Sequence, residues 1–215
     1  MTTKIERRWR GFAGAVASAA LALAANSAHS QTALDADLIR QLREGGYVIV
    51  MRHASAPRAA PDAATARPAN ANRERQLDDV GLATAAAMGE ALRALKIPIG
   101  EVLVSPTFRA LETAERLSLG EPRPVAELGD GGRDMRADTE GVRSAWLRSH
   151  AATSPPAGSN KLMITHVPNL VGAFGETMAN TGDGEALIVD PRGGEPDIVA
   201  RVPIEDWPKL ATGER

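Results

Sequence analysis

Four side chains of the sequence are of types that can bind an anion and react with it. Each comes directly after a short apolar run, or a few residues beyond one. A guanidinium group holds an anion through paired N–H donors, and a neutral imidazole is a nucleophile or proton carrier near neutral pH. Any one of these side chains alone is an ordinary surface residue, so the prediction depends on their convergence. The four residues are Arg52, His53, Arg109 and His166.

The apolar runs before these residues have the pattern of buried strands. They are short, rich in aliphatic residues and bounded by polar or turn-forming residues. They cover residues 47–51, 101–104 and 161–165. Amphipathic or alanine-rich segments alternate with them and predict helices. These cover residues 35–44, 82–95, 107–117, 140–149 and 168–178.

Strands that alternate with helices predict an α/β fold, with a mostly parallel central sheet and helices on both faces. Residues 124–128 are a further expected strand. Residues 186–189 and 198–202, separated by Pro191-Arg192-Gly193-Gly194, predict an antiparallel hairpin at the edge of the sheet. In open α/β sheets, ligands bind beyond the carboxyl ends of the strands. All four candidate residues fall there, so we expect them to line one crevice.

Three motifs surround the candidates. They read Val-Met-Arg-His-Ala at residues 50–54, Val-Ser-Pro-Thr-Phe-Arg-Ala-Leu-Glu-Thr-Ala at residues 104–114, and Ile-Thr-His-Val-Pro-Asn-Leu at residues 164–170. A fourth segment, Leu-Asp-Asp-Val-Gly at residues 77–81, precedes the alanine-rich helix. In the order and spacing of these motifs the chain resembles the histidine phosphatase superfamily, with its phosphoglycerate mutase-like fold. The resemblance covers nearly all of residues 31–215.

The resemblance implies a role for each candidate. His53 is the nucleophile that forms a phosphohistidine. Arg52 and Arg109 hold the phosphoryl oxygens, and His166 donates a hydrogen bond to the transferring group. The chemistry agrees, because a phosphate monoester is a dianion whose charge two guanidinium groups offset, and a neutral imidazole can attack phosphorus in line. Since side chains supply the positive charge, we expect no metal and no cofactor.

The proton donor to the leaving oxygen has two candidates. In the phytase-like branch an Asp follows the second histidine, whereas this chain has Val167. Glu127, at the end of the predicted strand 124–128, matches the place where mutase-like members carry their acid. Glu185, after a Gly-Asp-Gly turn, is the alternative. If neither donates, the leaving group departs unassisted, which favours activated substrates such as phosphohistidine or aryl phosphates.

Residues 54–76 predict a long loop without periodicity, and loops of that length are usually functional. The family usually has Gly where Ala54 begins this loop, and a methyl group there would crowd the phosphate loop if the backbone needs a positive φ. The loop carries four arginines that either bind further negative charge on a substrate, as a lid, or balance surface acids. They are Arg58, Arg67, Arg73 and Arg75.

The composition is that of a packed globular protein and excludes several classes. The chain has no cysteine, which excludes disulfide frameworks, thiolate metal sites and thiol nucleophiles. Aromatic residues make up 3% of the chain, too few for the stacking platforms that bind single-stranded nucleic acid.

The first thirty residues have the three-part layout of a secretory signal peptide. A basic start precedes an uncharged stretch at residues 11–25, and Ala28-His29-Ser30 is suited to cleavage after Ser30. We therefore expect a signal peptide at residues 1–30, one histidine phosphatase-like domain at residues 31–215, and a periplasmic or secreted product without stable membrane insertion. Residues 1–30 carry four cations and one carboxylate, so their removal takes the formal charge from −2 to −5 and disfavours nucleic acid as a partner.

Two classes of function follow. The first is hydrolysis of a phosphorylated small molecule or a phosphoprotein through a phosphohistidine. The second is a non-catalytic module of the same fold that binds phosphate or sugar phosphates. Neither the substrate nor the oligomeric state follows from the sequence. The presence of all four candidate residues favours the enzyme.

Overall fold

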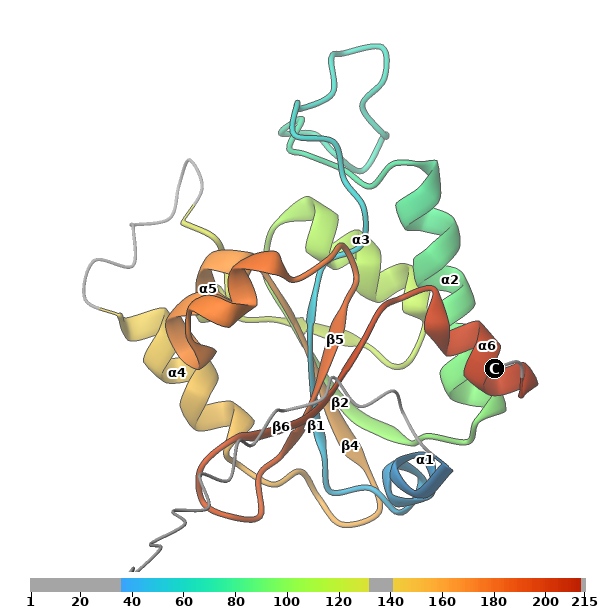
Figure 1. Ribbon diagram of the computed structural model, residues 1–215. Coiled ribbons are helices and arrows are strands. Elements are labelled where there is room, and N and C mark those ends of the chain that lie inside the picture. The colour runs from blue at the N-terminus through green and yellow to red at the C-terminus, as the bar shows by residue number, and fades with distance from the viewer. Residues whose placement is uncertain (1–35, 132–140, 214–215) are drawn as a thin grey trace, which may run out of the picture. The chain divides into compact units, whose positions relative to one another are not determined.

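A computed structural model describes residues 36–131 and 141–213 of the 215 (Figure 1). The expected signal peptide lies outside this part of the chain and stays a prediction. Six strands form one sheet. They are β1 (Val48–Arg52), β2 (Ile99–Val104), β3 (Pro122–Pro124), β4 (Asn160–Thr165), β5 (Ala186–Asp190) and β6 (Asp197–Val202). The helices are α1 (Ala36–Glu44), α2 (Asp79–Ala94), α3 (Phe108–Leu117), α4 (Val142–Ala151), α5 (Val167–Phe174) and α6 (Asp206–Thr212), with 3₁₀ turns η1 (Ala126–Leu128) and η2 (Glu176–Asn180).

The sheet has the strand order β3-β2-β4-β1-β5-β6. The pairs β1–β4, β2–β4 and β2–β3 are parallel, whereas β1–β5 and β5–β6 are antiparallel. The expected mostly parallel sheet with an antiparallel edge hairpin is confirmed. The register pairs Arg52 with Thr165, and Val104 with Ile164, so the carboxyl ends of β1, β2 and β4 lie level with one another.

Two hydrophobic cores lie on the two faces of the sheet, because neighbouring residues of a strand point to opposite faces. In β1, Ile49 and Met51 belong to the core that also contains buried residues of α1, α2, α3 and α6. Val48 and Val50 belong to the core that contains buried residues of α4 and α5. All four side chains are fully buried, so β1 is covered on both faces (Figure 1).

Helix α2 begins three residues before the expected start at Leu82, because Asp78 caps it. The Asp78 Oδ1 atom accepts a hydrogen bond of 2.7 Å from the Gly81 backbone N–H. Helix α2 then packs closely on α3, where a methyl group on Gly89 would lie 2.0 Å from the Leu117 carbonyl oxygen. This contact fixes α3, which carries Arg109.

The strand expected at residues 124–128 is placed wrongly. The strand is β3, Pro122–Pro124, and the chain turns after it into η1. Proline has no backbone N–H, so a strand with two prolines is confined to the sheet edge, where β3 pairs with β2 alone. Glu127 therefore lies in a 3₁₀ turn rather than at the end of a strand.

Two helical segments also differ from expectation. The helix expected at residues 168–178 ends at Phe174, because Gly175 has a φ of 96°, and η2 follows. Helix α6 was not expected, although its Trp207 is fully buried against the sheet core. No helix in the two described stretches of chain is long and apolar enough to cross a membrane.

The loop of residues 54–76 contains no helix or strand, as expected, and it is anchored on α3. The Glu112 side chain, buried on α3, pairs with Arg67 at 2.8 Å and accepts a 2.8 Å hydrogen bond from the Leu77 backbone N–H. The Glu74 carboxylate accepts a 3.1 Å hydrogen bond from the Phe108 backbone N–H at the start of α3. These contacts hold the loop against the same helix that carries Arg109.

Candidate active site

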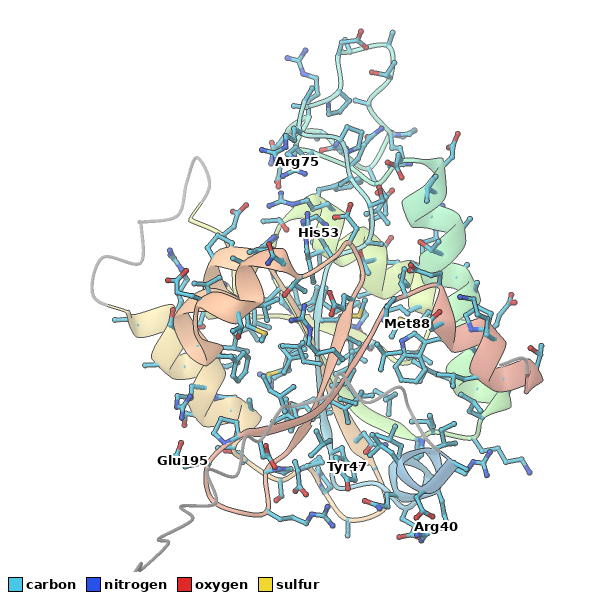
Figure 2. All side chains as sticks on the ribbon, viewed as in Figure 1. Arg40, Tyr47, His53, Arg75, Met88 and Glu195 are labelled. Carbon is cyan, nitrogen blue, oxygen red and sulfur yellow. The ribbon has the colours of Figure 1, made fainter. Side chains whose placement is uncertain are left out.

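The carboxyl ends of β1, β2 and β4 bring the four predicted residues to one place. Backbone hydrogen bonds join the segments just beyond these strands, from His53 N–H to the Thr165 oxygen (3.1 Å) and from Ser105 N–H to the Ile164 oxygen (2.9 Å). His53 lies at this end of the sheet, at the base of the loop of residues 54–76 (Figure 2). Arg109 and His166 both lie close to His53, as the sequence predicted.

His53 is buried and held as one neutral tautomer. Its Nδ1–H donates to the Ala54 carbonyl oxygen at 2.7 Å, so Nε2 carries the lone pair and accepts from Arg109 Nε at 3.1 Å. Burial, together with the positive charges of Arg109 and Arg52, lowers the pKa of His53 to about 3. The residue is therefore an uncharged imidazole with a nucleophilic nitrogen aimed at a guanidinium group.

His166 stands just before α5, and its ring centroid lies 5.2 Å from that of His53. Its Nδ1 accepts from Arg109 Nη2 at 3.2 Å, and its Nε2 lies 2.8 Å from the Ser105 hydroxyl. Burial and the charge of Arg109 lower the pKa of His166 well below its usual value. To donate from Nδ1 to a phosphoryl oxygen, His166 has to gain a proton there or change tautomer. The Ser105 hydroxyl accommodates either form, since it both donates and accepts.

Arg109, in the first turn of α3, connects these groups. Its side chain is 6% exposed. The Nε–Nη2 edge of the guanidinium group contacts His53 through Nε, and Nη2, which carries two N–H groups, contacts both His166 and the Asp130 carboxylate. This edge is the planar fork that binds carboxylates and phosphates with two hydrogen bonds.

Arg52, at the end of β1, holds a second carboxylate. Its Nη2 lies 2.7 Å from Asp183 Oδ1, and its Nη1 donates to the Thr181 carbonyl oxygen at 2.9 Å. Glu185 shapes the turn that presents Asp183, because Glu185 accepts from the Gly182 N–H at 2.7 Å and pairs with Arg201 at 2.6 Å. Both oxygens of Glu185 are thus engaged within the turn and the β5–β6 edge.

Arg75 adds a third positive charge near His53. It donates to the carbonyl oxygens of Pro57 (2.6 Å) and Ala56 (2.9 Å), which ties the two ends of the loop together. Figure 2 shows Arg75 next to His53, on the loop side. Burial and the charge of Arg109 lower the pKa of Arg75. Of the loop arginines, Arg67 is therefore an anchor, whereas Arg75 faces the site. Their spacing in the sequence does not distinguish them.

The carboxylates closest to the arginines are not the two that the sequence singled out. Asp130 contacts Arg109 and Asp183 contacts Arg52. Glu127 is partly exposed in η1, and its carboxylate has no hydrogen bond or ion pair with another described residue. Glu185 pairs with Arg201. Within residues 36–131 and 141–213, no three His, Asp or Glu side chains are grouped so that they could hold a metal ion.

Ala54, the departure from the usual family motif, is accommodated without strain. Among the described residues that are not glycine, a positive φ occurs at Arg73, Lys96 and Ser118. Ala54 is fully buried, and its N–H donates to the Thr113 hydroxyl at 3.1 Å. The methyl group therefore meets no conformational penalty.

Comparison with known proteins identifies a family for this chain. Residues 48–161 match the sequence profile of the histidine phosphatase superfamily (branch 1). The matched segment contains Arg52, His53 and Arg109, and His166 lies just beyond it. No protein of curated function matches the sequence.

Two solved structures resemble this chain, and the first shares its fold. The protein histidine phosphatase SixA complexed with tungstate aligns with a TM-score of 0.53 and 23% identity, over 74% of this chain and 98% of that one. The putative phosphohistidine phosphatase SixA from Agrobacterium tumefaciens aligns with a TM-score of 0.49 and 16% identity, over 74% and 98% of the two chains. Since the profile match covers more than half of the sequence and includes three of the four site residues, the chain belongs to the histidine phosphatase superfamily.

Proposed function

We propose that this protein is a phosphomonoester hydrolase that transfers the phosphoryl group first to His53 and then to water. One observation carries the proposal. His53 is a neutral imidazole whose free Nε2 contacts the side-on fork of Arg109. A phosphoryl group bound to that fork lies against the nucleophilic nitrogen. Membership of the family supports the same reaction.

The first half of the reaction follows from these contacts. Two phosphoryl oxygens accept hydrogen bonds from Arg109 Nε and Nη2, and Arg52 offsets the remaining negative charge. His53 Nε2 attacks phosphorus in line, the N–P bond forms, and the P–O bond to the leaving group breaks. The Ala54 carbonyl oxygen, which accepts from Nδ1–H, stabilises the positive charge that develops on the ring.

In the second half, water attacks the phosphohistidine, the P–N bond breaks, and inorganic phosphate leaves. His166 and Arg109 bind the phosphoryl group in both halves. Side chains supply the charge compensation in this scheme, so the reaction needs no metal. We propose a phosphorylated small molecule or a phosphoprotein as the substrate, and Arg75 as a further contact for its negative charge.

The test is a survey of the purified protein against sugar, nucleotide, aryl and protein-histidine phosphates, with wild type and His53→Ala in parallel. We expect turnover of at least one class, and a loss of about 10³-fold or more in His53→Ala, as when other nucleophiles are removed. His150→Ala is the matched control, because His150 stacks on Trp146 in α4. Its activity should equal that of the wild type.

Two results would contradict the proposal. Undiminished turnover in His53→Ala would show that another group is the nucleophile. Binding of inorganic phosphate without turnover of any class would favour the non-catalytic module instead.

We also propose that residues 1–30 direct export and are removed, so that the protein is periplasmic or secreted. The proposal rests on the basic, apolar and small-residue pattern of this segment. Sequencing the N-terminus of the protein recovered from the cell envelope or medium tests it. The expected first residue is Gln31. Protein that keeps Met1 and stays in the cytoplasm would contradict it.

A further inference from the structure

The fork of Arg109 already holds an anion of this chain. Its Nε contacts His53 Nε2 at 3.1 Å, and its Nη2 contacts the Asp130 carboxylate. Nη2 also contacts His166 Nδ1 at 3.2 Å, so a phosphoryl group that binds Nε and Nη2 competes with the Asp130 oxygen and with His166 for Nη2. His53 thus contacts one nitrogen of the guanidinium edge that we expect to bind phosphate, and Asp130 contacts the other.

Asp130 is held at this place by the segment that precedes it. The Leu128 carbonyl oxygen accepts from the Thr165 hydroxyl at 2.8 Å, and the Gly129 carbonyl oxygen accepts from Asn169 Nδ2 at 2.7 Å. Thr165 and Asn169 flank His166, so the elements that place His166 also place Asp130. The Asp130 side chain is 25% exposed, which leaves its carboxylate able to exchange protons with solvent.

Substrate binding changes the electrostatics of this carboxylate. Before binding, the Arg109 cation favours the ionised form of Asp130. A phosphate dianion that takes over Arg109 removes this contact and places like charge beside the carboxylate. Both changes favour the protonated acid, and the proton comes from solvent or from a substrate that binds as its monoanion.

We propose that Asp130 is the general acid of the reaction and becomes competent only when the phosphoryl group displaces it from Arg109. The proposal rests on the phosphatase function proposed above. As the N–P bond to His53 forms and the P–O bond breaks, the Asp130 carboxyl gives its proton to the leaving oxygen. Asp130 then takes a proton from the water that attacks the phosphohistidine, which restores the acid as phosphate leaves.

The geometry distinguishes Asp130 from the other carboxylates. In-line attack by His53 directs the leaving oxygen to the side of phosphorus away from His53. Asp130 contacts Nη2 of Arg109, whereas His53 contacts Nε. Glu127 lies in the preceding turn, and its carboxylate has no hydrogen bond or ion pair with another described residue. Asp183 contacts Arg52 rather than Arg109, and its side chain is 42% exposed. It therefore serves as a control carboxylate for Asp130.

The experiment measures kcat/KM of Asp130→Asn for glycerol 2-phosphate, whose alkoxide needs a proton to leave, and for p-nitrophenyl phosphate, whose phenolate does not. We expect a loss of about 100-fold or more for the alkyl ester and little change for the aryl ester. Inorganic phosphate should inhibit the variant more strongly, on the order of fivefold, because Arg109 no longer holds a competing charge. The alkaline limb of the alkyl-ester pH profile should disappear. Replacing a merely structural residue would not weaken hydrolysis of the alkyl ester while it strengthens inhibition by phosphate.

Glu127→Gln and Asp183→Asn are the matched variants, and neither should change the ratio of alkyl to aryl rates. An equal loss on both esters in Asp130→Asn, or no loss, would overturn the assignment, as would a selective alkyl loss in Glu127→Gln. A wild type that cleaves the aryl ester alone would also overturn it, since no acid would then be in use. Failure of the proposed function is distinguishable on the aryl ester, because the wild type would then not hydrolyse it or His53→Ala would hydrolyse it as fast as the wild type.

Discussion

Helix α3 carries two arginine–carboxylate pairs one turn apart, and they differ in what surrounds them. Glu112 pairs with Arg67 of the loop. Glu112 also accepts a hydrogen bond from the Leu77 N–H, and Arg67 donates one to the Leu77 carbonyl oxygen, each at 2.8 Å. Arg109 pairs with Asp130, but its other contacts are the neutral imidazoles of His53 and His166. In the first pair, backbone groups of Leu77 satisfy the remaining hydrogen-bonding atoms. In the second pair, the other partners of Arg109 are uncharged and do not offset its positive charge.

This difference separates an anchor from an exchangeable contact. In the Arg67–Glu112 pair both charges and their hydrogen-bonding atoms are satisfied, so nothing is gained when a ligand intervenes. Around Arg109, positive charge is in excess, because Arg52 and Arg75 lie close enough to lower the pKa of His53. A dianion is therefore a better partner for Arg109 than one carboxylate is. The same pair of residue types stabilises the loop in one place and prepares a binding site in the other.

The largest expected effect is on activity, from Arg109→Ala. We expect kcat/KM to fall by about 10³-fold or more, as for other guanidinium groups that hold a transferring phosphoryl group. The melting temperature should fall as well, because the side chain is 6% exposed and its loss removes the ion pair with Asp130, but the protein that remains folded should be inactive. Arg109→Lys should restore little activity, since a point charge cannot replace the fork. Steady-state kinetics and thermal unfolding of the two variants measure this. A variant that melts, while its folded fraction stays fully active, would make Arg109 structural.

Loss of the Arg67–Glu112 pair should reduce the stability of the protein far more than its activity. Glu112→Gln leaves Arg67 without a counter-charge and should lower the free energy of unfolding by about 3 kcal/mol. The kcat of the folded protein should fall far less than in Arg109→Ala. Urea unfolding and kinetics on the same samples measure both. Glu195→Gln is the control, because its pair with Arg148 is exposed and its loss should not be measurable. Stability equal to the wild type in Glu112→Gln would refute the anchoring role.

The neutral histidines make the stability of the protein depend on pH. In the unfolded chain His53 has its ordinary pKa of 6.5, and in the folded protein its pKa is about 3. Between these values the unfolded state binds more protons, so stability is greatest above pH 6.5 and falls as the pH decreases toward 3. One such group contributes a slope of at most about 1.4 kcal/mol per pH unit. His53→Gln should flatten the curve of unfolding free energy against pH. An unchanged slope would mean that His53 is protonated in the folded protein.

The smallest expected effect is that of Ala54→Gly, which restores the usual family residue. Since Ala54 has no positive φ and its N–H binds Thr113, we expect kcat/KM to change by less than about twofold. Kinetics on p-nitrophenyl phosphate measures it. A large gain in activity would show that the methyl group crowds the phosphate site after all.

The buried strands and the motifs that follow them could be predicted from the pattern of apolar residues in the sequence. Buried strands such as β1 have no polar residue within their core-facing run, and the motifs that follow them fall at the carboxyl edge that a parallel sheet must have. The sequence could not predict the end of β3, because Pro122 and Pro124 decide it through absent N–H groups rather than through hydrophobicity. Helix α6 is too short for its period to stand out.

The same limit applies to the site. Arg52, His53, Arg109 and His166 follow strands, so topology alone brings them together. Asp130 and Arg75 reach the site through a turn and a loop, whose course depends on contacts such as Thr165 with the Leu128 carbonyl oxygen. Side chains distant in sequence make these contacts, and no local pattern reveals them.

The central claim is that His53 becomes phosphorylated, and trapping the intermediate tests it most directly. Wild-type protein is mixed with a ³²P-labelled aryl phosphate, quenched rapidly without acid, and digested for peptide mapping. The account predicts one labelled peptide that contains His53, with a linkage stable to alkali and labile to acid, and no label in His53→Ala. Label on another residue, or rapid turnover by a wild type that never carries label, would contradict it.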